Sequence, residues 1–129
     1  MSKGLLLFFS TMLLVSCVKD KSIAVTQING FPPDIMGCSC YYAVDEAHFQ
    51  KQQFIYIDSY ETTPAYISIN DFLIAVDPKN EQNSKYTLDL EIEEEIQLDQ
   101  ERYHREGTLK ITDKNGAVYS TSIYGECGC

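Results

Sequence analysis

Four cysteines in two short motifs carry most of the chemistry that this sequence offers. One motif is Cys38–Cys40 (CSC), near the start of the body of the chain, and the other is Cys127–Cys129 (CGC), at its end. In an extended strand, residues i and i+2 point to the same face, so each motif would present its two sulfur atoms together. Four cysteines allow three pairings, and two of these would join one motif to the other.

The preferred use of these four cysteines is a pair of disulfides that ties the two ends of the domain together. The pairing of Cys38 with Cys129 and Cys40 with Cys127 suits antiparallel neighbours, because residue numbers run in opposite directions along them. The pairing of Cys38 with Cys127 and Cys40 with Cys129 stays open. Closing a loop of roughly 90 residues stabilises a chain by about 4–5 kcal/mol in the chain-entropy model.

The same sulfur atoms would also suit two other kinds of site. As four thiolates, Cys38, Cys40, Cys127 and Cys129 would form a tetrahedral Zn²⁺ or Cu⁺ site, although structural zinc sites usually separate paired cysteines by two to four residues. Alternatively, the CGC motif could be redox-active. No helix N-terminus, Lys or Arg adjoins it in the sequence to favour a thiolate, and Glu126 adds a negative charge beside it.

The fifth cysteine follows an apolar leader. Met1–Lys3 supplies a positive charge and Gly4–Leu14 is almost wholly apolar, which is the arrangement of a secretory signal peptide. A membrane-spanning helix needs about 20 apolar residues, and this run is too short. The stretch Leu14–Cys17 (LVSC) resembles the lipobox of bacterial lipoproteins. The resemblance implies cleavage after Ser16 and attachment of a diacylglyceryl group and an acyl chain such as palmitate to Cys17, which would anchor the protein to a membrane.

The leader sets the expected organisation and location of the chain. We expect a signal peptide at residues 1–16, a lipidated tether at 17–30 and a single domain at 31–129. Removing residues 1–16 from the 129-residue chain leaves 113 residues, with 9 basic against 19 acidic side chains and a net charge of −10. The expected location is the cell envelope, as an outer-membrane lipoprotein facing either the periplasm or the outside. Such a compartment favours disulfides.

Period-two alternation of apolar and polar residues predicts an all-β domain. About seven strands with frequent turns favour a small antiparallel sandwich or barrel, with the first and last strands adjacent. A short helix is expected at Glu46–Gln52, a loop at Gln100–Glu106 and a hairpin turn at Asp113–Gly116. The expected strands are Cys38–Val44, Gln53–Tyr60, Pro64–Asn70, Phe72–Val76, Lys85–Asp99, Gly107–Thr112 and Ala117–Tyr124.

An acidic row runs along the clearest of these strands. In Lys85–Asp99 the apolar residues share one parity, and Glu94 interrupts them, which predicts a bulge or a bend. On the other parity, four carboxylates would lie about 7 Å apart on one face. Such a face would meet a cationic partner or weakly hold Ca²⁺, or it would simply be a solvated strand face. The four residues are Asp89, Glu91, Glu93 and Glu95.

No other motif predicts a reaction. His48 and His104 are isolated, and the sequence contains neither a G-x-S-x-G motif nor a Gly-rich phosphate loop. The net charge of −9 argues against nucleic acid as a partner. Tyrosines would serve a sugar- or peptide-stacking face as well as a strand core. The tyrosines considered for such a face are Tyr41, Tyr56, Tyr60 and Tyr66.

The sequence therefore predicts a lipid-anchored binding or structural module of the cell envelope, without enzymatic activity or cofactor. The two alternatives are a Zn- or Cu-binding envelope protein and an inhibitor of a basic enzyme, for which the acidic row would be the contact. The stretch "GCSCYYAV" together with the terminal "YGECGC" resembles small uncharacterised bacterial lipoproteins that pair CSC with CGC. That resemblance implies the architecture and brings no activity with it.

Overall fold

The computed structural model describes residues 22–35, 37–60, 64–77 and 85–129. The described part of the chain is almost entirely β-structure with one short helix, α1 (Glu46–Gln50), and it contains no helix that could cross a membrane. The strands are β1 Val25–Thr26, β2 Ile28–Asn29, β3 Ser39–Ala43, β4 Gln53–Phe54, β5 Tyr56–Ser59, β6 Ala65–Ile69, β7 Phe72–Val76, β8 Tyr86–Gln97, β9 Tyr103–Asp113 and β10 Val118–Gly128.

Eight of these strands form one sheet. Its order is β1-β6-β5-β3-β10-β9-β8, with β7 on the other side of β6, and a separate small sheet pairs β2 with β4. Every pairing between these strands is antiparallel. The strand that carries the CSC motif, β3, lies directly beside the last strand, β10. The predicted all-β antiparallel fold with adjacent terminal strands is therefore confirmed.

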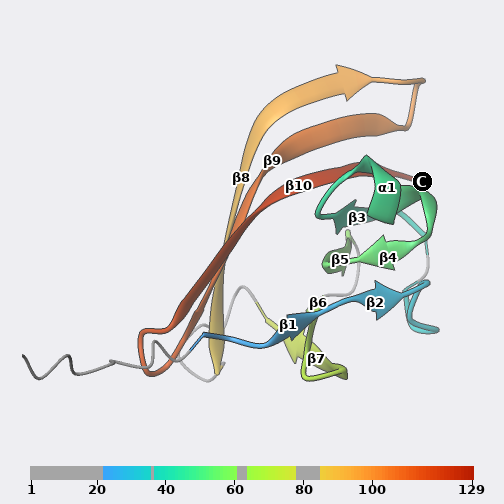
Figure 1. The fold of residues 1–129 in the computed structure, drawn as a ribbon. Helices are drawn as coiled ribbons and strands as arrows, with labels where there is room; N and C mark the ends of the chain where they lie inside the picture. The colour runs from blue at the N-terminus through green and yellow to red at the C-terminus, as the bar shows by residue number, and fades with distance from the viewer. Residues whose placement is uncertain (1–21, 36, 61–63, 78–84) are drawn as a thin grey trace, which may run out of the picture.

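The sheet bends sharply across its three longest strands. Figure 1 shows β8, β9 and β10 side by side, each bent near its midpoint. In β8 the register with β9 shifts between Ile92 and Glu94, so Glu93 is the extra residue of a β-bulge. In β9, opposite the bulge, a Cβ atom on Gly107 would overlap the carbonyl oxygen of Glu91, and in β10 a Cβ atom on Gly125 would overlap that of Tyr41. The bend therefore requires glycine at both positions.

Because the sheet bends, it encloses a core on one of its faces. The main apolar cluster joins β3, β5, β6, β9 and β10, and the inward side chains of β8 pack against it. The strands β7 and β8 lie at the two edges of the sheet and contact each other. The bent sheet therefore wraps around this core. A second, smaller cluster lies on the opposite face of β3 and β5, under α1 and the β2–β4 sheet, and its buried members are Ile28, Phe54 and Ile57.

Two predicted local elements are confirmed. The helix begins after Asp45, whose side chain accepts a hydrogen bond from the backbone N–H of His48 at 2.8 Å, the usual N-cap arrangement. The turn Asp113–Gly116 joins β9 to β10, with Gly116 in the left-handed region at φ 84°. Its backbone N–H donates to the carbonyl of Asp113 at 3.1 Å. The turn was predicted from its Asn-Gly sequence, which is a local signal.

Several boundaries differ from expectation, and the predicted strand Gln53–Tyr60 is divided between β4 and β5, which lie in different sheets. The predicted loop Gln100–Glu106 is half strand, because β9 already begins at Tyr103. The segment 17–30, expected to be a tether, contributes β1 and β2, and Ile23 is buried in the main core. The domain therefore begins before residue 31. The signal peptide, the lipobox and Cys17 lie outside the described residues.

Candidate functional site

Two disulfides join β3 to β10. Cys40 pairs with Cys127, which lies directly opposite in the strand register, and Cys38 pairs with Cys129. Their Cα atoms are 4.0 Å and 3.9 Å apart. This is the crossed pairing favoured for antiparallel neighbours. The alternative of a thiolate metal site needs four free sulfur atoms, whereas the structure bonds all four to one another.

The two bridges differ in their surroundings. We call Cys40–Cys127 the inner disulfide, since these residues are 5% and 0% exposed, and Cys38–Cys129 the outer disulfide, since Cys38 is half-buried and Cys129 exposed. The hydroxyl of Tyr42 lies 3.1 Å from Cys127 Sγ and must be the donor, because a disulfide sulfur carries no hydrogen. The inner disulfide is therefore a packed part of the core with its own polar contacts.

Arg105 is the unexpected neighbour of the inner disulfide. Its Nη1 atom lies 3.3 Å from Cys127 Sγ and 3.9 Å from Cys40 Sγ, and its Nε atom pairs with Glu95 Oε2 at 2.6 Å. The sequence showed no Lys or Arg adjoining the CGC motif. Arg105 belongs instead to the neighbouring strand, β9. A guanidinium here would stabilise negative charge on Cys127 if the bridge were opened.

Buried tyrosines and one carboxylate complete this polar cluster. Tyr56 donates to Asp58 Oδ2 at 2.7 Å, and Asp58 Oδ1 accepts from the backbone N–H of Cys40 at 3.2 Å. Burial raises the pKa of Tyr56, with Asp58 as a second cause, and burial also raises that of Tyr42, although Arg105 partly opposes this. Both hydroxyls are neutral at physiological pH, so they act as donors. The polar groups of the cluster form hydrogen bonds with one another, so their burial in the core leaves them satisfied.

The acidic row does not form one face. Leu88, Leu90 and Ile92 point toward the main core, so Asp89 and Glu91, at alternate positions, point away from it. After the bulge at Glu93 the parity reverses. Glu95 lies opposite Arg105, on the same face as the inner disulfide. The predicted partner face of Asp89, Glu91, Glu93 and Glu95 is therefore divided between the two sides of the sheet.

Glu94 is redirected by the same bulge. It lies opposite Glu106 in the register, and the hydrogen bond and repulsion between these two carboxyl groups raise the pKa of Glu94. His104 Nε2 is 3.5 Å from Glu106 Oε2, and its ring lies 4.5 Å from that of Tyr124. Among the described residues, no three His, Cys, Asp or Glu side chains converge in a way that would hold a metal ion.

The tyrosines considered for a stacking face are also divided. Tyr56 belongs to the main core, whereas Tyr41 and Tyr66 pack on the second cluster, on the opposite face. Tyr41 lies parallel to Phe49 with ring centroids 5.8 Å apart, and the Tyr66 hydroxyl donates to Asp34. Tyr60 is half exposed, and its hydroxyl lies 3.8 Å from Cys40 Sγ. No single tyrosine face exists among these four.

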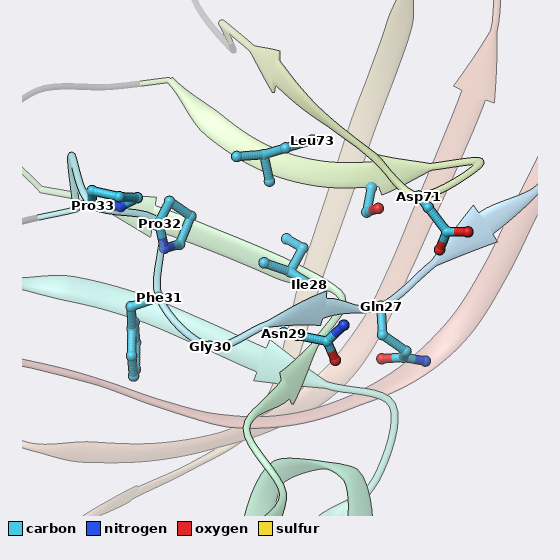
Figure 2. Close-up of a pocket in the computed structure, with 10 residues that line it drawn as sticks. Gln27, Ile28, Asn29, Gly30, Phe31, Pro32, Pro33, Asp71 and Leu73 are labelled. Carbon is cyan, nitrogen blue, oxygen red and sulfur yellow. The ribbon is translucent and has the colours of Figure 1, made fainter.

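An open groove that sequence analysis did not predict lies beside β2. Figure 2 shows Phe31, Pro32 and Pro33 on the segment that follows β2, with Leu73 of β7 and Ile28 of β2 across from them. The volume is about 320 Å³, enough for a small polar ligand or two to three residues of a chain. We call this the Phe31 groove. Its lining residues are Gln27, Ile28, Asn29, Gly30, Phe31, Pro32, Pro33, Ser68, Asp71 and Leu73.

The Phe31 groove combines apolar walls with polar ends. The ring of Phe31 is 45% exposed, while its edge packs against Tyr41 at a centroid distance of 5.1 Å. The side-chain oxygen of Gln27 is buried and has no hydrogen-bond partner among the described residues. The groove brings together segments about 40 residues apart. The Gly30–Pro33 sequence (GFPP) was the one local signal that could have drawn attention to it.

No family model, curated protein or solved structure matches the chain.

Proposed function

We propose that this protein is a lipid-anchored module of the cell envelope that binds a partner or ligand without catalysing a reaction. One observation carries the proposal. Two disulfides join β3 to the last strand, β10, of a small domain, and disulfides form and persist in exported proteins rather than in the reducing cytosol. The leader that precedes Cys17 supplies the matching route of export.

A lipid anchor at Cys17 supports the second half of the proposal. A single acyl chain gives marginal membrane binding, whereas two or more chains hold a protein firmly. The triacylated cysteine implied by the lipobox resemblance would therefore keep the domain at a membrane without any spanning helix.

Binding is a better fit than catalysis for the sites that the structure describes. The polar groups around the inner disulfide are engaged with one another and lie in the core. The Phe31 groove is open, and its mixture of an exposed ring, prolines and amide groups suits holding a ligand. An inhibitor of a basic enzyme is less well supported, because the acidic row is divided by the bulge.

The deciding experiment follows the anchor and the thiols in the expressed protein. Cells producing the full chain are fractionated, and the protein is extracted with detergent for intact mass and thiol titration. We expect loss of residues 1–16, a mass gain equal to the acyl groups, and no free thiol. Cys17→Ser is the matched control, and it should leave the membrane fraction. Unprocessed chain in the cytosol, or four titratable thiols in the exported protein, would contradict the proposal.

A further inference from the structure

The tip of the β6–β7 hairpin exposes two large apolar side chains. Phe72 is 74% exposed, the highest value among the large hydrophobic residues that the structure describes, and Leu73 beside it is 48% exposed. They follow a tight turn in which Asn70 and Asp71 both have positive φ, 51° and 65°. Isolated exposed apolar residues are ordinary on protein surfaces, so position must decide whether this pair has a role.

This tip is hydrogen-bonded to the first residues that the structure describes. The backbone N–H of Asn70 donates to the carbonyl of Ala24 at 2.9 Å, and that of Asp71 donates to Thr26 Oγ1 at 2.9 Å. Ile23 is buried in the main core just before these contacts. The first described residues of the chain therefore lie beside the hairpin tip.

The connection to Cys17 is short. Six residue steps separate Cys17 from Ile23, and even a fully extended chain spans only about 20 Å over that distance. If Cys17 carries acyl chains within a membrane, Ile23 lies within that distance of the lipid surface. The domain then cannot stand far from the membrane, and the side nearest to it is the side that presents Phe72.

We propose that Phe72 enters the lipid interface next to the anchor and fixes how the domain stands on the membrane. This rests on the lipidation proposed above. The acyl chains supply the membrane affinity, so the tip needs only to add orientation. Asp71, exposed in the same turn, stays in the headgroup region, which limits insertion to a shallow depth. Figure 1 places β7 and β1 together at one end of the molecule, and the C-terminal end of β8 at the other.

The test uses the absence of tryptophan from the sequence. Phe72→Trp puts a single fluorescent reporter at the tip, and Ile96→Trp puts one at a 48% exposed site near the far end of β8. Each full-length lipidated protein is reconstituted into phosphatidylethanolamine–phosphatidylglycerol vesicles, with or without brominated acyl chains. Bromine quenches tryptophan only at short range. Leu73→Trp serves as a second tip reporter should Phe72→Trp fold poorly.

We expect brominated lipid to reduce the emission of the Phe72→Trp protein about twofold or more and to leave the Ile96→Trp protein almost unchanged, as shallow insertion of one end requires. Equal quenching of both reporters, or of neither, would overturn the inference. Intact mass of the same samples separates the two proposals. A lipidated protein without tip quenching refutes this inference alone, whereas a protein without acyl groups refutes the proposed function and the inference with it.

Discussion

The inner and outer disulfides join the same two strands, yet they lie in different environments. Their sequence separations are 87 and 91 residues, so each alone would restrict the unfolded chain almost equally. Cys127 is fully buried against Tyr42 and Arg105, whereas Cys129 is exposed at the end of the chain. The comparison separates two contributions to stability. The loss of chain entropy is common to both bridges, and the packing belongs to one of them.

The largest expected effect comes from removing both bridges. The chain-entropy model assigns about 4–5 kcal/mol to the first bridge, and about 2 kcal/mol to the second, which closes a ring of only about six residues. A loss of about 7 kcal/mol is comparable with the whole stability of a small domain. We therefore expect the variant with all four cysteines changed to Ala to be largely unfolded by circular dichroism at 25 °C. A cooperative urea transition close to that of the wild type would contradict this.

Removing one bridge at a time should separate the two contributions. Cys38→Ala/Cys129→Ala should lower the free energy of unfolding by about 2 kcal/mol, the ring-closure share alone. Cys40→Ala/Cys127→Ala should lower it by about 3–4 kcal/mol, because buried sulfur atoms also leave a cavity. Urea unfolding of the two double variants measures the difference directly. Equal losses would mean that packing around the inner disulfide contributes nothing.

The two arginines nearest the bridges provide a smaller and matched contrast. Arg105→Met removes the guanidinium at the inner disulfide and its ion pair with Glu95, and we expect a loss of about 1–2 kcal/mol. Arg102→Met acts beside the outer disulfide, where the side chain is half exposed and pairs with Asp99 at the surface, so we expect a change within about 0.5 kcal/mol. Urea unfolding compares the two variants. A reversed order would show that Arg105 is strained rather than stabilising.

The sequence predicted the two bridges but not the difference between their surroundings. The spacing of the cysteines predicted that they would join the two ends, and alternation predicted the neighbouring strands, because both signals are local. Arg105 lies within the charged stretch Gln100–Glu106, which the sequence predicted to be a loop. Its position became meaningful only through pairing with β10, a contact between distant parts of the chain. No local pattern reports which side chain a neighbouring strand will supply.

The bulge at Glu93 shows the same limit in another form. The sequence indicated that Glu94 would disturb β8, yet one extra residue decides which face every later side chain occupies. Glu95 thereby left the acidic row and became the partner of Arg105. The Phe31 groove was equally unpredictable, because it is assembled from β2 and its following loop together with a hairpin about 40 residues away.

The smallest expected effect is the share of the alkaline pH dependence that Tyr56 contributes at the inner side. Burial raises the pKa of Tyr56 above its ordinary value of 10, so the folded state holds the proton more tightly than the unfolded state. The stability from this difference is complete below pH 10 and is lost as the pH rises above it. Between pH 9 and 10.5, we expect the free energy of unfolding to fall by about 1 kcal/mol less in Tyr56→Phe than in the wild type. Urea unfolding at the two pH values measures this difference. Cys38→Ala/Cys129→Ala should keep the wild-type dependence, since Tyr56 lies beside the inner disulfide, and a dependence that vanished with the outer bridge would contradict this.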